Sequence, residues 1–83
     1  MDISREINIY EKKGDTLLES ISINNIELNQ LINILGVNIK EDPYVYKIYG
    51  ITNDKLIRLS EYIPELLKYN FEAFSFYYEC YQM

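Results

Sequence analysis

The sequence predicts an α+β fold in the order β-β-α-β-α-β, with a four-stranded, at least partly antiparallel sheet and two helices packed on one face. Three observations support this prediction. Segments near both ends of the sequence alternate between polar and apolar residues, which is typical of strands. Two internal segments each carry one apolar stripe at helical spacing, so each helix needs a sheet to bury it. The length of 83 residues suits one domain, which we expect to span residues 1–83.

The first two strands are expected to form a hairpin. Glu6–Glu11 alternates between polar and apolar residues, and Lys12–Asp15 is a turn whose glycine can adopt a positive φ. Thr16–Ile23 is the returning strand. Its pattern is imperfect, because Glu19 falls on the same face as Leu17 and the strand's isoleucines. A β-bulge near Glu19 would account for this mismatch.

The first helix is predicted from its cap signals as well as from its apolar stripe. Asn24 is the expected N-cap, with Glu27 as the capping-box partner three residues later. Leucine and isoleucine side chains then recur on one face as far as Leu35, and Gly36 ends the helix in a left-handed conformation. We expect Val37–Pro43 to be a loop.

The second half of the sequence predicts a strand, a helix and a final strand. Tyr46–Thr52 is rich in residues typical of strands, and Thr52 or Asn53 caps the helix that follows. Pro64 lies within the apolar stripe of this helix and removes a backbone donor, so we expect a kink or a restart there. Phe71–Tyr81 is the most strand-like stretch of the sequence.

Strand alternation predicts that one face of the sheet lacks a helical cover. Successive side chains point to opposite faces, and the more apolar set should face the helices. The inward set is Ile7, Ile9, Phe74, Phe76, Tyr78 and Cys80. The set left on the open face is Glu6, Asn8, Tyr10, Tyr77, Glu79 and Tyr81.

Tyrosines and carboxylates on an open sheet face suit the binding of a basic protein partner, since tyrosine offers both a rigid ring and a hydroxyl. We predict that Glu6, Tyr10, Tyr77, Glu79 and Tyr81 contact this partner. The alternatives are ordinary cross-strand tyrosines or the seam of a homodimer.

A second candidate surface is the loop that precedes the third strand. It offers Glu41, Asp42 and Tyr44 as partner-binding residues. The simpler interpretation is that Asp42 forms a turn, because an Asp-Pro pair initiates turns well.

Charge and composition limit the classes of partner and the compartment. The net charge of −5, from 13 acidic and 8 basic residues, disfavours nucleic acid and anionic membranes, which need a basic surface. It favours a basic partner or simply solubility. Apolar runs are too short for a membrane span, and one cysteine allows no internal disulfide. With no apolar leader segment visible, we expect a cytoplasmic protein.

The residues needed for common catalytic and metal sites are scarce. The sequence has no histidine, one cysteine and three scattered glycines. These features disfavour imidazole catalysis, a Cys-x-x-Cys pair and a phosphate-binding loop. We therefore predict no enzyme activity, no metal site and no cofactor.

Four segments resemble a family of short acidic bacterial proteins of unknown function. They are Ile9-Tyr10-Glu11-Lys12, Leu31 to Gly36, Asp42-Pro43 with Tyr46 and Tyr49, and Tyr77-Tyr78-Glu79-Cys80-Tyr81. Such proteins are similar to the immunity partners of polymorphic toxins, including those of contact-dependent growth inhibition systems. The resemblance implies a cytoplasmic protein that binds and neutralises a cognate toxin domain, of a basic nuclease type. The alternative is a small homodimeric structural or regulatory adaptor, and the free protein is expected to be a monomer or a homodimer.

Overall fold

The strands form a single sheet in the computed structural model, which describes residues 3–82. They are β1 (Ile3–Glu11), β2 (Leu17–Ser22), β3 (Tyr49–Gly50) and β4 (Phe74–Gln82). Their spatial order is β2-β1-β4-β3, and each neighbouring pair is antiparallel. The α+β class and the order of elements are confirmed, and the structure adds the strand order.

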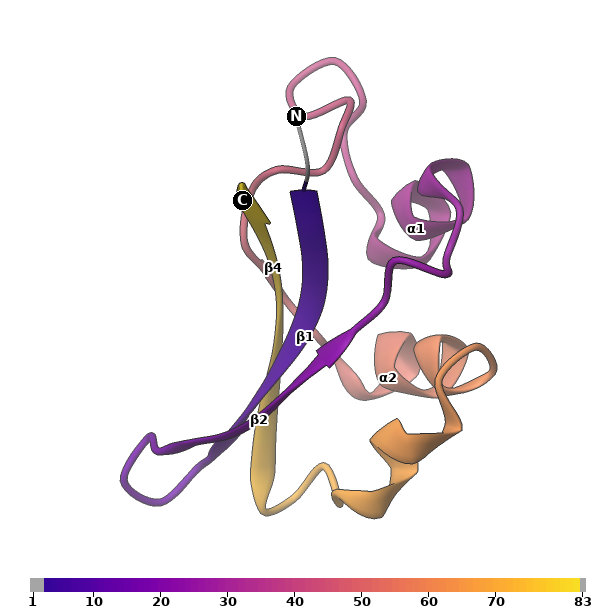
Figure 1. Ribbon diagram of the computed structural model, residues 1–83. Helices are drawn as coiled ribbons and strands as arrows, with labels where there is room; N and C mark the ends of the chain where they lie inside the picture. The colour runs from indigo at the N-terminus through magenta and orange to yellow at the C-terminus, as the bar shows by residue number, and fades with distance from the viewer. Residues whose placement is uncertain (1–2, 83) are drawn as a thin grey trace.

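Both helices cover the same face of the sheet, which leaves the other face open (Figure 1). They are α1 (Leu28–Leu35) and α2 (Asn53–Ser60), followed by the short 3-10 helix η1 (Pro64–Lys68). The expected restart at Pro64 is confirmed, because the proline occupies the first turn of η1. No helix within residues 3–82 is both long and apolar enough to cross a membrane.

The pairing of β1 with β4 forms the centre of the sheet. Nine consecutive pairs run from Ile3 opposite Gln82 to Glu11 opposite Phe74 without a register shift. Paired residues share a face, so Ile7 and Ile9 lie beside Tyr78 and Phe76 on the helix side. These four side chains are buried in the core together with residues of α1, α2 and η1.

The suspected β-bulge in the hairpin is present. The β1–β2 register shifts after Ile9, which pairs with Glu19, whereas Tyr10 pairs with Leu17. Leu18 is therefore the extra residue, and Leu17 lies on the open face rather than on the core face where the sequence placed it. Its side chain is 50% exposed. Glu19 stays on the helix side, where it accepts a hydrogen bond from the Tyr69 hydroxyl.

The predicted capping box at the start of α1 is wrong, whereas the predicted end of α1 and the predicted start of α2 are confirmed. The helix begins after Glu27, and no side chain caps it. Asn24 instead accepts the backbone N–H of Arg5 at 2.8 Å, which ties the end of β2 to β1. Gly36 ends α1 with a φ of 68°, and Thr52 caps α2 by accepting the N–H of Lys55.

The third strand is much shorter than the predicted range Tyr46–Thr52. Only Tyr49 and Gly50 pair with β4. The physical reason is that the backbone N–H groups of Tyr46 and Lys47 donate to the carboxylate of Asp42, at 2.9 and 3.1 Å. Those donors are thereby used within the loop and cannot join the ladder.

A buried hydroxyl links β4 to this loop. Tyr78 is fully buried, and its hydroxyl donates to the carbonyl oxygen of Val45 at 2.6 Å. Val45 is buried as well and has a φ of 57°, which is a strained conformation for a β-branched residue. Burial and the bond from Tyr78 hold this residue in place.

We expect Tyr78→Phe to lower the free energy of unfolding by about 1–3 kcal/mol, because the buried carbonyl of Val45 loses its partner. Urea denaturation followed by far-UV circular dichroism measures the change. Tyr62→Phe is the matched control, since Tyr62 is exposed after α2. Equal stabilities of the two variants would contradict the structural role of this bond.

Candidate partner-binding face

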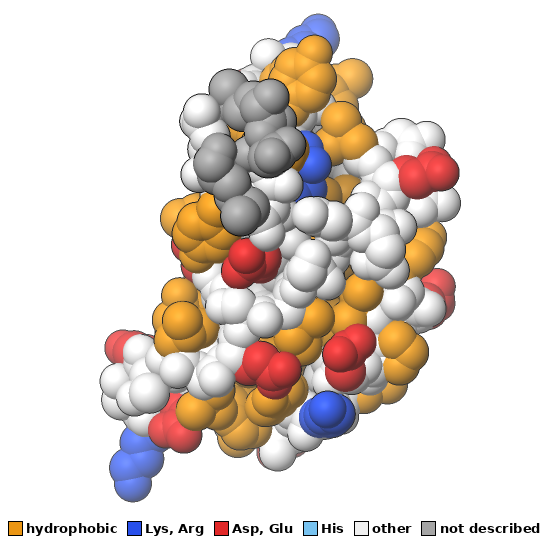
Figure 2. All heavy atoms as spheres, in the orientation of Figure 1, with side chains coloured by type: hydrophobic (Ala, Val, Ile, Leu, Met, Phe, Trp, Pro, Cys, Tyr) orange, Lys and Arg blue, Asp and Glu red, His pale blue; other side chains and the backbone are white. Residues whose placement is uncertain are grey.

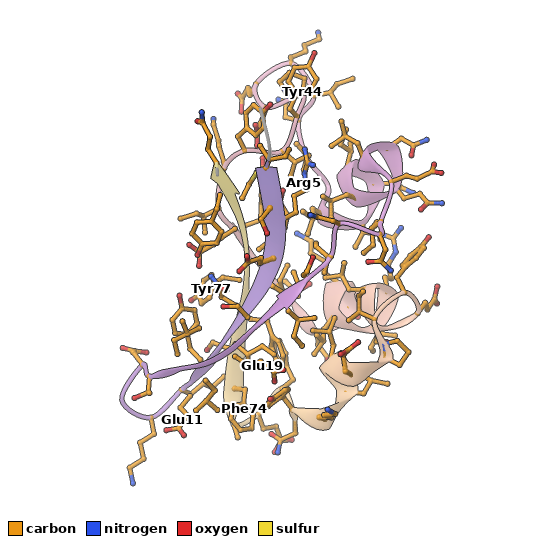
Figure 3. The ribbon with its side chains drawn as sticks, viewed as in Figure 1. Arg5, Glu11, Glu19, Tyr44, Phe74 and Tyr77 are labelled. Atoms are coloured by element: carbon orange, nitrogen blue, oxygen red, sulfur yellow. The ribbon has the colours of Figure 1, made fainter. Side chains whose placement is uncertain are left out.

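The structure brings the predicted sheet residues together on the open face, defined here as Glu6, Asn8, Tyr10, Leu17, Tyr77, Glu79 and Tyr81. In the β1–β4 register, Glu6 lies opposite Glu79 and Asn8 lies opposite Tyr77. Figure 3 shows Tyr77 on the side of the sheet away from the helices, and Arg5 and Glu19 on the helix side. The predicted division of β1 and β4 into two faces is therefore confirmed.

Asn8 is the hub of the open face, and its side chain is only 1% exposed. Its amide nitrogen donates to Glu79 Oε2 at 2.5 Å and to the Tyr81 hydroxyl oxygen at 2.8 Å. Its carbonyl oxygen accepts the Ser20 hydroxyl at 2.6 Å. One buried amide thus fixes side chains from β2 and β4, and the sequence pattern gave Asn8 no such role.

Tyr10 supports the same carboxylate from the neighbouring strand. Its hydroxyl donates to Glu79 Oε2 at 3.3 Å, and its ring meets that of Tyr77 edge to face at a centroid distance of 5.8 Å. Partial burial and the charge of Glu79 raise the pKa of Tyr10 above its ordinary value. Tyr10 is therefore a neutral donor near pH 7.

Tyr77 and Tyr81 supply the exposed aromatic surface of the open face. Each side chain is 42% exposed. The bond from Asn8 lowers the pKa of Tyr81, but burial and the charge of Glu79 outweigh this effect and raise it above its ordinary value. Tyr81 thus also keeps its proton near pH 7. The face offers two half-exposed rings with neutral hydroxyls beside a carboxylate.

A shallow hollow opens on this face, and we call it the face hollow. It has a volume of about 450 Å³ and is lined by Tyr10, Asp15, Ile48, Ser75, Tyr77 and Glu79. Asp15 comes from the hairpin turn, and Ile48, which is 65% exposed, comes from the segment before β3. In the view of Figure 2, carboxylates lie among hydrophobic side chains over much of the surface, and basic groups are few.

Sequence reasoning missed Leu17 on the open face, and it missed Asp15 and Ile48 in the lining of the face hollow. Leu17 lies on the open face only because of the bulge at Leu18. The sequence signal for this bulge was the polar residue Glu19 within an apolar pattern. Asp15 and Ile48 lie outside the regular alternation of the long strands, so no periodic pattern marked them.

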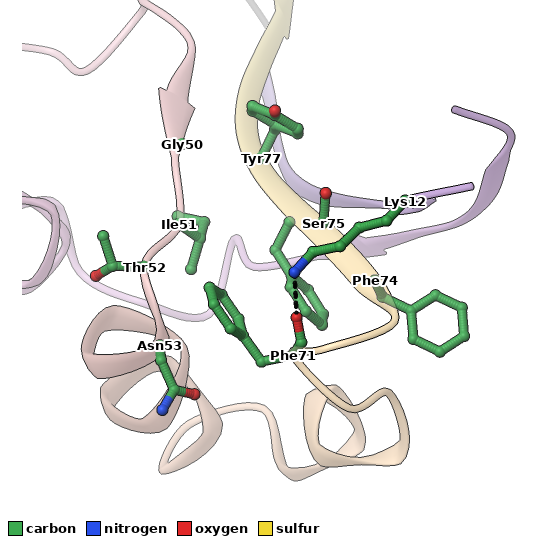
Figure 4. Close-up of a pocket in the computed structure, with 10 residues that line it drawn as sticks. Lys12, Gly50, Ile51, Thr52, Asn53, Phe71, Phe74, Ser75 and Tyr77 are labelled. Carbon is green, nitrogen blue, oxygen red and sulfur yellow. Dashed lines mark hydrogen bonds between the residues drawn. The ribbon is translucent and has the colours of Figure 1, made fainter. Parts of the chain in front are cut away.

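A second hollow, the edge groove, lies where β3 parts from β4. Its volume is about 470 Å³, and its lining includes Lys12, Gly50–Asn53, Phe71, Ser75 and Tyr77. Figure 4 shows Lys12 extending along it, with Nζ donating to the carbonyl oxygen of Phe71 at 2.8 Å. The Lys12 ammonium also lies 5.0 Å from the centroid of the Phe71 ring. The edge groove therefore has a positive group at one side and a largely apolar floor.

The loop residues predicted as a second contact surface do not line either hollow. Asp42 is 5% exposed, and its carboxylate accepts two backbone N–H groups and the Tyr49 hydroxyl at 2.7 Å. This placement corrects its assignment as a partner contact and supports the turn-forming interpretation. Glu41 and Tyr44 are exposed, and the Tyr44 ring stacks on Tyr46 at 5.8 Å.

Burial and hydrogen bonds shift the pKa values of Asp42 and Tyr49. Burial acts to raise the pKa of Asp42, but the bonds from Tyr49, Tyr46 and Lys47 prevail and hold it below its ordinary value of 3.8. Burial, with the bond to Asp42, raises the pKa of Tyr49 to about 12. Asp42 is therefore charged and Tyr49 neutral near pH 7.

Cysteine chemistry and metal binding were considered for the described residues 3–82. Cys80 is a free, partly buried thiol on the helix face of β4, packed against the core. No group of three or more histidine, cysteine, aspartate or glutamate residues is placed to hold a metal ion in this range.

Residues 4–79 match a family described as a domain of unknown function, DUF7683. The chain belongs to the DUF7683 family. Comparisons with curated proteins and with solved structures give no match. The DUF7683 match begins in β1 and ends at Glu79, so it includes most of the open face with Asn8 and Tyr77.

We expect Asp42→Asn in this DUF7683 chain to lower the free energy of unfolding by about 1–3 kcal/mol near neutral pH, because an amide cannot satisfy all three donors. The folded pKa of Asp42 lies below its ordinary value of 3.8. Its stabilisation is therefore complete above that value and is lost as the pH falls through the folded pKa. Urea titrations at about pH 7 and about pH 2.5 should give a gap between wild type and variant that narrows in acid. A gap that is unchanged between the two pH values would contradict this account.

We expect Asn8→Ala to reduce stability by about 1–3 kcal/mol, since Ser20, Glu79 and Tyr81 lose their common partner. Asn25→Ala, at an exposed turn residue, is the matched control. Urea denaturation measures both variants. A loss of unfolding free energy no larger than that of the control would contradict the role of Asn8 in ordering the side chains of the open face.

Proposed function

We propose that the protein is a cytoplasmic immunity protein that binds and neutralises a cognate bacterial toxin domain of a basic nuclease type. In this proposal the open face covers a surface of the toxin, and inhibition comes from binding without catalysis. The family membership leaves the function open, so the support comes from the chemistry of this face.

The observation that carries the proposal is the hydrogen-bond network around Asn8. It holds Glu79 and Tyr81 in place through bonds of 2.5 and 2.8 Å. Side chains that are ordered before binding lose less conformational entropy when a partner arrives. A network that orders a carboxylate and a tyrosine on the surface therefore favours binding, since a sheet needs neither for its own core.

The charge of the chain supports a basic partner. The net charge is −5, and Glu6 and Glu79 lie side by side on β1 and β4. Nucleases that bind a phosphate backbone need a basic surface. An acidic inhibitor can occupy that surface, and complementary charge accelerates the encounter and disfavours wrong partners.

An interface of ordinary size would occupy a modest part of the surface of this small protein. A standard interface buries about 800 Å² on each partner, which is roughly a seventh of the 5402 Å² accessible surface of this chain. Leu17 and Ile48 border the tyrosines and extend the apolar part of this surface. Aromatic side chains inside a polar rim are typical of the residues that dominate binding energy.

A homodimeric adaptor is the second candidate, and β2 is the feature that favours it. This strand is at the edge of the sheet, and its Leu17 and Leu18 are both exposed. An exposed edge strand can pair with the same strand of a second copy. The bulge at Leu18 interrupts this edge, which weakens the case for pairing.

The deciding experiment is a pull-down of the tagged protein against the product of the adjacent gene, at low and at high salt. The proposal predicts a one-to-one complex that weakens as salt rises, because the contacts between exposed charges are screened. Light scattering of the free protein at high concentration separates the two candidates. Absence of a complex together with a stable dimer would replace the immunity proposal with the adaptor.

Within such a complex, we expect Tyr77→Ser to reduce affinity by roughly 10- to 100-fold, as for a central aromatic contact. Tyr62→Ser is the matched control, because Tyr62 is an exposed tyrosine outside the open face. Isothermal titration calorimetry measures both affinities. Equal affinities for the two variants would place the interface elsewhere on the chain.

A further inference from the structure

We infer that the face hollow is the socket for an arginine side chain of the protein partner. The identity of that partner rests on the proposed function, whereas the chemistry of the socket rests on the residues that line it.

The charged groups in the lining of the face hollow are carboxylates. Two carboxylates line the face hollow, Glu79 from β4 and Asp15 from the hairpin turn, and no basic residue is among the six that line it. The Asn8 amide and the Tyr10 hydroxyl both donate to Oε2 of Glu79. Both donors are neutral, so they orient the carboxylate without cancelling its charge. The Oε1 atom keeps lone pairs for an incoming donor.

Two aromatic rings form walls of the face hollow. Tyr10 and Tyr77 meet at an interplanar angle of 78° and form an aromatic corner beside Glu79. A guanidinium is planar, stacks on aromatic rings and donates up to five hydrogen bonds, which suits a corner of this kind better than a compact ammonium does. Exposed Ile48 offers apolar surface for the methylene stem of the same side chain.

The neighbouring edge groove differs from the face hollow in charge. Ser75 and Tyr77 line both hollows. The edge groove contains the Lys12 ammonium, as Figure 4 shows, and the face hollow contains the two carboxylates. A cationic side chain that reaches Tyr77 is therefore attracted toward the face hollow and repelled from the edge groove. The charge difference between the two hollows therefore favours the face hollow as the position of a cationic side chain.

The test uses the full chain and two small probes, N-acetyl-arginine amide and its neutral isostere N-acetyl-citrulline amide. Each is titrated at low ionic strength while backbone amide chemical shifts are recorded by NMR. We expect saturable shifts at Tyr10, Ile48 and Tyr77–Glu79 with the arginine probe, and at least about fivefold weaker binding of the citrulline probe. Equal binding of the two probes, or shifts spread over all acidic residues, would overturn the inference.

Variants assign the effect to the lining residues. Glu79→Gln and Asp15→Asn should each weaken the arginine probe by several-fold, whereas Glu65→Gln, in η1 and outside the hollow, should not. Because each carboxylate is substituted in a separate variant, the test remains valid when one variant perturbs the fold. Asparagine is the replacement at Asp15 because it tolerates the positive φ of 54° at this position. N-acetyl-lysine amide binding as tightly as the arginine probe would overturn the preference for a guanidinium.

The outcomes for the socket and for the function are separable. Selective arginine binding in the hollow without any toxin complex would refute the immunity proposal and keep the socket. A toxin complex that tolerates both Glu79→Gln and Asp15→Asn would refute the socket and keep the immunity proposal.

Discussion

The unbroken antiparallel pairing of β1 with β4 is the constraint on which the rest of the structure depends. Nine consecutive pairs join segments that are far apart in sequence, and β2 and β3 attach only at the two outer edges of this pair. Long-range pairing of this kind is entropically costly to close, so the core contacts must form together with it. The buried residues of the helices pack in one cluster with the core residues of this central pair.

The same pairing generates both the core and the open face. Odd-numbered positions of β1 carry Ile7 and Ile9 into the core, and even-numbered positions carry Glu6, Asn8 and Tyr10 outward. A slip of one residue would exchange the two sets, so the apolar core also fixes the arrangement of the binding residues. Asn8 is buried on the outward side, and its polar groups are satisfied there by Ser20, Glu79 and Tyr81.

Irregular backbone features define the borders of the open face. The bulge at Leu18 moves Leu17 outward, and the bonds of Asp42 to Tyr46 and Lys47 delay the start of β3. The early end of pairing between β3 and β4 leaves the edge groove beside Tyr77. These features hold Asp15, Ile48 and Lys12 around the tyrosines, so the charge pattern near Tyr77 depends on turns as much as on strands.

The sequence by itself determined the fold class, the order of elements and the two faces of β1 and β4. Alternation and helical spacing are local patterns that burial enforces, so Glu6, Tyr10, Tyr77, Glu79 and Tyr81 were assigned correctly to the open face. The sequence also predicted the structural roles of Pro64, Gly36 and Thr52. Proline geometry, a left-handed cap and a side-chain cap are local constraints, so each depends on nearby residues alone. Only the tertiary structure decided the burial of Asp42, the tie of Asn24 to Arg5, the shortness of β3 and the central position of Asn8. Each depends on a hydrogen-bond partner chosen from competing groups in space, and spacing along the chain does not encode that choice.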